Sequence, residues 1–151
     1  MNIDQYVQLL KGTHMGACAL KDLKEKAHDE TLKQLLVESL TQLHQHEEWL
    51  SQELIQHDTA VPDTQGLQGM FANAMMKVKN LMLEDDEEIV KEAMSEIESG
   101  QKALQIFEEE QLSMQVSLVK QLKVMKDDYA IMYHRLHQYY LKYREDHFHV
   151  V

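Results

Sequence analysis

Breakers of regular structure are scarce in this chain, and their scarcity constrains the fold more than any other feature. The 151 residues include only five glycines and one proline, the two residues that most often interrupt helices and strands. Between them, apolar residues recur at spacings of three, four or seven, the repeat of a helix with one buried face. No segment alternates with the period of two that a half-buried strand requires. The sequence therefore predicts an all-α protein.

The helical repeat divides the chain into two pairs of long segments. The first pair comprises helices at about residues 3–28 and 30–56. The connection between them is so short that they must lie antiparallel, as a helical hairpin. Residues of about 86–111 and of about 113–145 form a second pair, whose start carries an acidic run that complements the helix dipole. Two hairpins joined by a long connection predict a four-helix bundle of the ferritin-like type.

The connection between the two hairpins, at about residues 57–83, is expected to cross over the bundle. It begins with a loop around Pro62 and continues as a short Met-rich helix at about 67–83. A chain of 151 residues favours one domain. We therefore expect residues 1–151 to form a single bundle domain that includes this crossover.

The composition argues against several classes of protein. Its 26 acidic and 15 basic residues give a net charge of −11, whereas a nucleic-acid binder needs clustered Lys and Arg to contact phosphates. No apolar run approaches the roughly 18 residues of a membrane span, and the first residues do not resemble a signal peptide, so we expect no membrane association. Cys18 is the only cysteine and cannot form an intrachain disulfide. A cytoplasmic protein with a buried, unreactive thiol is therefore expected.

Glycine also marks a short repeat between the two hairpins. The pattern Gly-x-x-Ala-Leu-x-x-apolar begins at Gly16 in the first hairpin and at Gly100 in the second. A glycine inside a helix costs about 1 kcal/mol relative to alanine. Two glycines at matching positions therefore predict close contact with a neighbouring helix.

Two segments of the chain resemble a known family. Residues 10–16 (Leu-Lys-Gly-Thr-His-Met-Gly) resemble the opening of bacterial ferritin-like proteins of uncharacterised function, which are distant relatives of rubrerythrin. Residues 66–81 resemble the crossover helix that those proteins carry between their hairpins. The similarity covers most of residues 5–107, and it implies the ferritin-like scaffold.

The same resemblance implies positions for a di-iron site, which requires inward carboxylates and a Glu-x-x-His in each hairpin. This chain has Thr13, Leu43 and Ile97 where the family pattern implies glutamates, with Leu43 three residues before His46. None of these three side chains can bridge two metal ions. The resemblance therefore implies the scaffold without its chemistry, and we expect no catalytic residue and no bound cofactor.

A reduced metal site is an alternative. His46 and Glu47 lie near the inward stripe of the second helix, and His14 lies across the hairpin. Together they could hold one iron or manganese ion, or they could be polar groups that bond to each other or line a solvated helix edge. The second interpretation is favoured because the last helix offers Asp127, Asp128 and His134 but no Glu-x-x-His.

Tyrosines concentrate in the last helix, where five of the six fall between positions 129 and 143. One narrow helix face cannot bury all five, and an exposed aromatic patch often marks a contact with another molecule. We therefore expect self-association as a homodimer through this helix. The five residues are Tyr129, Tyr133, Tyr139, Tyr140 and Tyr143.

Three functions remain open at this point. The favoured one is a bundle that has lost its di-iron centre and has a structural or interaction role, for which the family analogy suggests stress or sporulation. The second is an iron- or manganese-dependent oxidase or peroxidase with a remodelled site around His46. The third is an adaptor that binds a protein partner through the Met-rich or the Tyr-rich helix.

Overall fold

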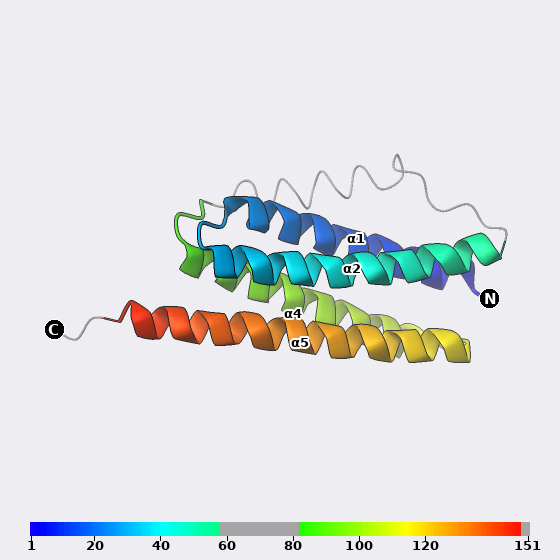
Figure 1. The fold of residues 1–151 in the computed structure, drawn as a ribbon. Coiled ribbons are helices and arrows are strands. Elements are labelled where there is room, and N and C mark those ends of the chain that lie inside the picture. Colours follow the sequence, from blue (N-terminus) through cyan, green and yellow to red (C-terminus); the bar gives the residue numbers. More distant parts are fainter. Residues whose placement is uncertain (58–81, 149–151) are drawn as a thin grey trace.

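Four long helices lie side by side in the computed structural model, which describes residues 1–57 and 82–148 (Figure 1). They are α1 (Ile3–Lys26), α2 (Glu30–Gln56), α4 (Asp86–Glu110) and α5 (Val116–Asp146). Within the two described ranges there is no strand. The prediction of an all-α fold is therefore confirmed.

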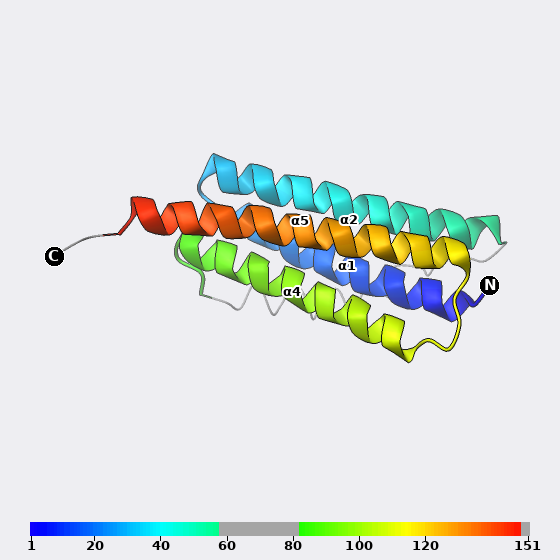
Figure 2. The ribbon, with the colours of Figure 1, turned by 90° about the horizontal axis from the view of Figure 1, so that it is seen from below.

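The helices are arranged as two antiparallel hairpins. Helices α1 and α2 are joined through residues 27–29, and α4 and α5 through residues 111–115. Helix α1 packs against α2 and α4, while α5 packs against α4 and, less extensively, against α2 (Figure 2). The order around the bundle is therefore α1, α2, α5, α4, and the predicted four-helix bundle of two hairpins is confirmed.

A single apolar core runs along the centre of the bundle, and every helix contributes to it. Most of the apolar residues that recur at helical spacing are buried, but Ile3, Val116 and Val119 are exposed. All three lie near helix ends, where fewer neighbouring residues cover them. Tyr6, which the apolar repeat did not include, is instead fully buried. The largest fully buried side chains are Tyr6, Leu20, Leu23, Leu32, Leu36, Leu43, Leu50, Leu54, Ile89, Ile97, Leu118 and Leu122.

Helix α5 begins at Val116, three residues later than the expected start at residue 113. The reason is a set of contacts with the start of α1. The Gln5 side-chain amide donates to Gln111 Oε1 at 2.8 Å and to the Ser113 carbonyl at 3.0 Å, which holds the connection between α4 and α5 in a non-helical path. The other predicted ends of the four long helices lie within two residues of the observed ones.

The first residue of α4 ties the two hairpins together at one end of the bundle. Asp86 accepts hydrogen bonds from the backbone N–H groups of His28 (2.8 Å) and Asp29 (2.9 Å) in the turn between α1 and α2. The Tyr139 hydroxyl of α5 donates to Asp29 Oδ2 at 2.7 Å. Asp85 caps α4 by accepting from the Glu88 N–H, so the acidic run starts the helix as predicted.

The expected Met-rich crossover helix lies outside the described residues except at its last two positions. Met82 and Leu83 are described, and neither is helical. The expected end of that helix at residue 83 is therefore wrong. These residues instead lead into Asp85, the N-cap of α4.

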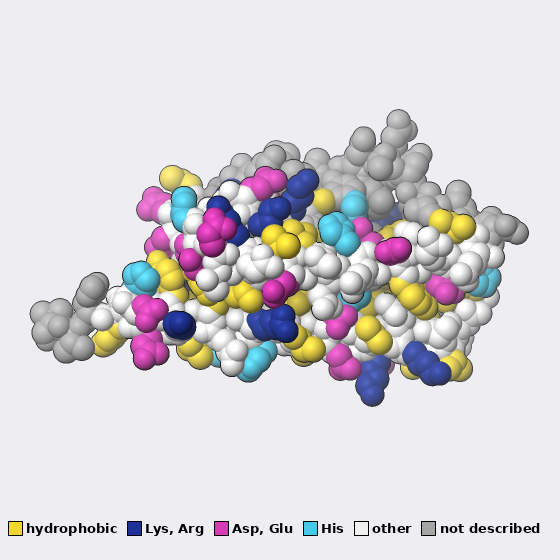
Figure 3. Space-filling view, viewed as in Figure 1, with side chains coloured by type: hydrophobic (Ala, Val, Ile, Leu, Met, Phe, Trp, Pro, Cys, Tyr) yellow, Lys and Arg dark blue, Asp and Glu magenta, His cyan; other side chains and the backbone are white. Residues whose placement is uncertain are grey.

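The visible surface of the bundle mixes charges of both signs. Figure 3 shows acidic, basic and histidine side chains interspersed with small hydrophobic areas over α1, α2 and α5. None of the helices in the described part of the chain has the length and hydropathy that are needed to cross a membrane.

Candidate functional site

Two of the three candidate metal ligands meet on the side of the first hairpin. His14 of α1 lies with its Nδ1 atom 2.7 Å from Glu47 Oε1 of α2. His44, one turn before Glu47, places its Nδ1 atom 3.6 Å from the other carboxylate oxygen. The His14 and Glu47 side chains are 30% and 16% exposed, so this polar contact lies at the edge of the bundle.

The third candidate, His46, is directed to a different partner. It is 2% exposed, and its Nε2 atom lies 2.7 Å from Asp128 Oδ2 of α5. The Gln42 amide, oriented with its nitrogen toward Asp128, donates to both carboxylate oxygens at 3.0 and 3.2 Å. The other ring nitrogen of His46, Nδ1, is buried and has no hydrogen-bond partner within the described residues. The result is a pair of a buried histidine and a partly exposed carboxylate that joins the two hairpins.

The structure therefore brings two of the three candidate ligands together and directs the third to another partner. His14 and Glu47 pair with each other, and His46 pairs with Asp128. Within residues 1–57 and 82–148, no group of three or more His, Cys, Asp or Glu side chains could hold a metal ion. The sequence singled out Asp128 by its chemistry, but no spacing rule connects α2 to α5, so its pairing with His46 was not foreseen.

The positions that the resemblance implies for bridging glutamates do face the interior of the bundle. Thr13 is 3% exposed, and Leu43 and Ile97 are each 1% exposed. The Thr13 hydroxyl donates to the Leu9 carbonyl in its own helix at 2.8 Å, and the other two side chains have no oxygen. The residues present therefore do not fit a di-iron centre, because no hard oxygen ligand faces the space between the helices at these positions.

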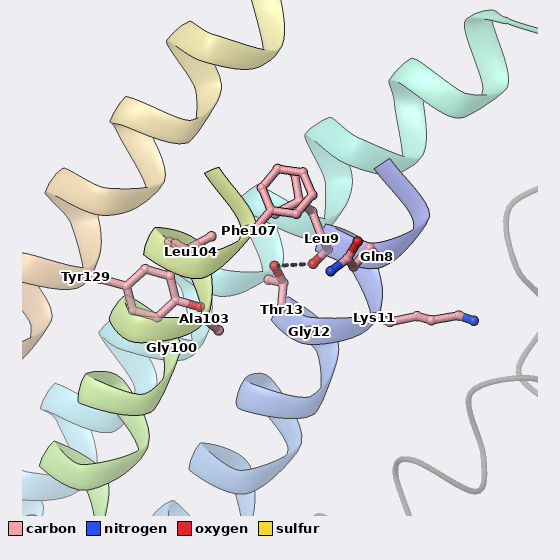
Figure 4. A pocket seen from close by; sticks show the side chains of 10 residues that line it. All are labelled: Gln8, Leu9, Lys11, Gly12, Thr13, Gly100, Ala103, Leu104, Phe107 and Tyr129. Atoms are coloured by element: carbon pink, nitrogen blue, oxygen red, sulfur yellow. Dashed lines mark hydrogen bonds between the residues drawn. The ribbon is translucent and has the colours of Figure 1, made fainter. Parts of the chain in front are cut away.

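Two hollows lie between α1 and α4 in the same region. One, of about 300 Å³, is lined mainly by apolar side chains that include Leu9, Leu104 and Phe107 (Figure 4). The other, of about 330 Å³, includes Leu43 and Ile97 in its lining. The hollows share four lining residues, Gly12, Gly100, Ala103 and Tyr129. Open space thus remains at the level of the implied metal site, but its described walls are mainly apolar.

Tyr129 reaches from α5 into this space. Its ring lies against His46, with ring centroids 6.1 Å apart, and its hydroxyl end points toward α4 and α1 (Figure 4). Gly100 makes room for the ring, because a Cβ atom there would lie 2.8 Å from Tyr129 Cε1. The close helix contact predicted at Gly100 is therefore confirmed. At Gly16 a Cβ atom would come only within 3.9 Å of Leu43, an ordinary contact.

The burial of Tyr129 and the partial burial of Cys18 raise the pKa values of both groups further above physiological pH. Desolvation, with a smaller effect of the Glu47 charge, raises the pKa of Tyr129 to about 12. Desolvation, followed by the same carboxylate, raises the pKa of Cys18 to about 11. Tyr129 is therefore a neutral hydrogen-bond donor at physiological pH. Cys18 is a protonated thiol rather than a nucleophile, because the thiolate is the reactive form.

A comparison with known protein families adds one match. A model of a domain of unknown function, DUF2383, matches residues 1–112. No curated protein and no solved structure matches the chain significantly. The matched residues contain α1, α2 and α4 and stop before α5 begins at Val116. Because the match covers more than half of the 151 residues, the chain belongs to the DUF2383 family.

Proposed function

We propose that this protein is a non-catalytic, ferritin-like bundle that lacks a di-iron centre and serves a structural or interaction role. The observation that carries the proposal is the chemistry of Thr13, Leu43 and Ile97. These side chains face the interior at the positions where the ferritin-like pattern implies bridging carboxylates. The Thr13 hydroxyl is bonded to a carbonyl of its own helix, and the other two side chains are hydrocarbons. A scaffold of this kind has kept its packing while its metal-binding positions have become part of the core.

A remodelled metal site around His46 is the second candidate, and one observation favours it. Metal-binding histidines typically donate their second ring N–H to a carboxylate, which leaves the other nitrogen available to the metal. The pair of His46 with Asp128 has this form, and His46 Nδ1 is buried without a partner among the described residues. A single imidazole nitrogen is nevertheless too few ligands for an iron or manganese site.

Metal analysis of protein purified without a His tag distinguishes the two candidates. The untagged chain is incubated anaerobically with Fe(II) or Mn(II), desalted and measured by mass spectrometry of the elements. The proposal expects less than about 0.1 equivalent of either metal, because a site with one available imidazole binds weakly. Stoichiometric metal that is lost in His46→Gln and retained in His44→Gln would establish the remodelled site and overturn the proposal.

We also propose that the interaction role includes self-association through α5. The tyrosines of this helix make contacts within their own chain: Tyr139 bonds to Asp29, and Tyr140 lies beneath Lys91 at 5.7 Å from ring centroid to ammonium. The exposed apolar residues Val124, Ile131 and Leu141 lie on the opposite side of the helix from the core and support the contact better than the tyrosines do.

Sedimentation at micromolar concentration tests this contact. We expect Ile131→Lys to dissociate the dimer, and Ile106→Lys, on the equally exposed Ile106 of α4, to leave it unchanged. Raising the salt concentration should strengthen the dimer, because screening reduces the repulsion between chains of net charge −11. A monomer of 17.7 kDa in moderate salt would contradict the proposal.

The adaptor hypothesis for the Met-rich helix concerns residues outside the described ranges. It remains a prediction from the sequence. Pull-down experiments with residues 67–83 deleted would test it.

A further inference from the structure

The first hollow between α1 and α4 has the properties of a small-molecule site. Its volume of about 300 Å³ lies at the lower end of the range for ligand pockets. Leu9, Ala103, Leu104 and Phe107 give it an apolar lining from both helices (Figure 4). An apolar cavity that admits a ligand usually presents a few polar groups that fix its orientation.

Tyr129 supplies such a polar group. Its side chain is 5% exposed and belongs to the lining of both hollows. Its oxygen is not among the fully enclosed polar atoms without a partner in the described part of the chain, so the hydroxyl borders the open space of the hollow. A phenol hydroxyl in this position can donate a hydrogen bond to an acceptor atom of a molecule that enters the hollow.

Gly12 keeps the α1 side of the hollow open. A Cβ atom at this position would meet nothing within 4 Å, so no neighbouring side chain or backbone requires a glycine there. Glycine is among the least favourable residues inside a helix. In contrast to Gly100, which admits the Tyr129 ring, Gly12 thus lacks a packing reason within the described residues. Gly12 is itself exposed, so the missing side chain leaves the hollow open to solvent at this position, which gives a ligand a route of entry.

The polar groups around the hollow favour an uncharged ligand. The Lys11 side chain extends away from it, and the Thr13 hydroxyl is bonded to the Leu9 carbonyl (Figure 4). Glu96 belongs to the lining of the second hollow only. Among the described lining residues of the first hollow Lys11 is the only charged one, and its side chain does not reach inward, so a charged ligand would lie apart from any counter-charge that these residues supply, which is unfavourable.

We propose that the hollow between α1 and α4 binds a small, uncharged, mainly apolar molecule with a carbonyl oxygen, which accepts a hydrogen bond from the Tyr129 hydroxyl. Aromatic or short aliphatic ketones and esters have this chemistry. The inference goes beyond the proposed structural or interaction role, and it depends neither on a metal nor on self-association.

Fluorine NMR with two probes that share a fluorophenyl ring tests the proposal on the full-length chain. The probes are 4′-fluoroacetophenone, which carries a ketone, and fluorobenzene, which does not. We expect both to bind the wild-type protein, the ketone more tightly. Tyr129→Phe should weaken the ketone by roughly two- to tenfold, the value of one hydrogen bond, and leave fluorobenzene within about twofold.

Substitutions at Gly12 locate the site independently. Gly12→Met fills the hollow and should abolish the binding of both probes, whereas Gly12→Ala adds one methyl group and should retain most of it. Circular dichroism and urea unfolding check that each variant is folded.

Three outcomes overturn the proposal. The first is a wild-type protein that binds neither probe up to the solubility limit of the probe. The second is an equal weakening of both probes by Tyr129→Phe, which would show that the hydroxyl does not bond to the ketone. Finally, Gly12→Met could lower the urea midpoint well below that of Gly12→Ala, which would mean that other atoms of the chain already fill the space.

Discussion

Gly12 and Gly100 lie on neighbouring helices and lack a side chain for opposite reasons. At Gly100 a Cβ atom would lie 2.8 Å from Tyr129 Cε1 and 3.2 Å from Cζ. Any side chain at position 100 would therefore collide with the Tyr129 ring. At Gly12 the same atom would enter open space. Substituting alanine at each position therefore separates two effects on stability, the low helix propensity of glycine and the steric crowding of an added side chain.

We expect Gly100→Ala to destabilise the protein by about 1–2 kcal/mol, because the Tyr129 ring must shift within the core. Gly12→Ala should stabilise it by up to about 1 kcal/mol, because alanine is the better helix former and meets no obstacle. Urea unfolding monitored by circular dichroism measures both changes. Equal effects of the two substitutions would show that the Tyr129 ring does not depend on the space at Gly100.

The His46–Asp128 pair is a second feature at the residue scale. Asp128→Ala leaves a buried imidazole without its acceptor, and we expect a loss of about 1–3 kcal/mol of unfolding free energy. The control is Asp127→Ala at the exposed neighbouring position, which should change stability by less than about 0.5 kcal/mol. Urea unfolding at pH 7 gives both values, and indistinguishable midpoints would mean that the pair does not contribute to stability.

Burial of Tyr129 predicts a loss of stability in alkali. Its pKa is raised to about 12, whereas the unfolded chain titrates near 10. The folded state thus holds the proton more tightly. Its contribution is fully present below pH 10 and is lost as the pH rises from 10 toward 12, by about 1–3 kcal/mol in total. Urea unfolding at pH 8 and at pH 11.5 should show a smaller loss for Tyr129→Phe than for wild type. Titration of Cys18 contributes equally to both proteins and cancels in the comparison. Equal losses of stability would therefore contradict the raised pKa of Tyr129.

At the scale of elements, the first residue of α4 stabilises a turn in the other hairpin. Both Asp86 oxygens accept backbone N–H groups from residues 28 and 29, and Asp86 is 8% exposed. Asp86→Ala leaves two partly buried backbone N–H groups without their acceptor. We expect it to lower the free energy of unfolding by about 2–4 kcal/mol. The control Glu84→Ala changes a nearby exposed acid and should have little effect. Thermal and urea unfolding compare the two variants, and a similar stability would refute the role of Asp86 as the tie.

The helices were predictable from the sequence, whereas their mutual contacts were not. The apolar repeat and the acidic start located α2 and α4 within one or two residues, because both signals are local. The start of α5 was misplaced because Gln5, more than 100 positions away, determines it. For the same reason His46 was grouped with His14 and Glu47, its neighbours in the first hairpin, although its partner Asp128 is 82 positions distant.

At the scale of the whole molecule, the region that matches the family ends before the last helix of the bundle begins. The match stops at residue 112, but α5 contributes six buried residues to the core. We expect a chain ending at residue 112 to lose its cooperative unfolding transition, because the core would lack one of its four sides. A chain ending at residue 148 keeps all four described helices and should unfold like the full-length protein. Cooperative unfolding of the shorter chain as a monomer would show that α5 is dispensable.

The tie made by Asp86 has a consequence for how quickly the native state forms and decays. Each hairpin is built from helices that are adjacent in the chain, and the largest helix contacts are within hairpins. Such contacts form early because little of the chain must be ordered to close them. The Asp86 bonds join positions 57 and 58 residues apart, and they can form only when the two hairpins dock. Interactions that are absent from the transition state act on the rate of unfolding. The two hydrogen bonds of one carboxylate should therefore determine how long the docked bundle survives rather than how fast it is reached.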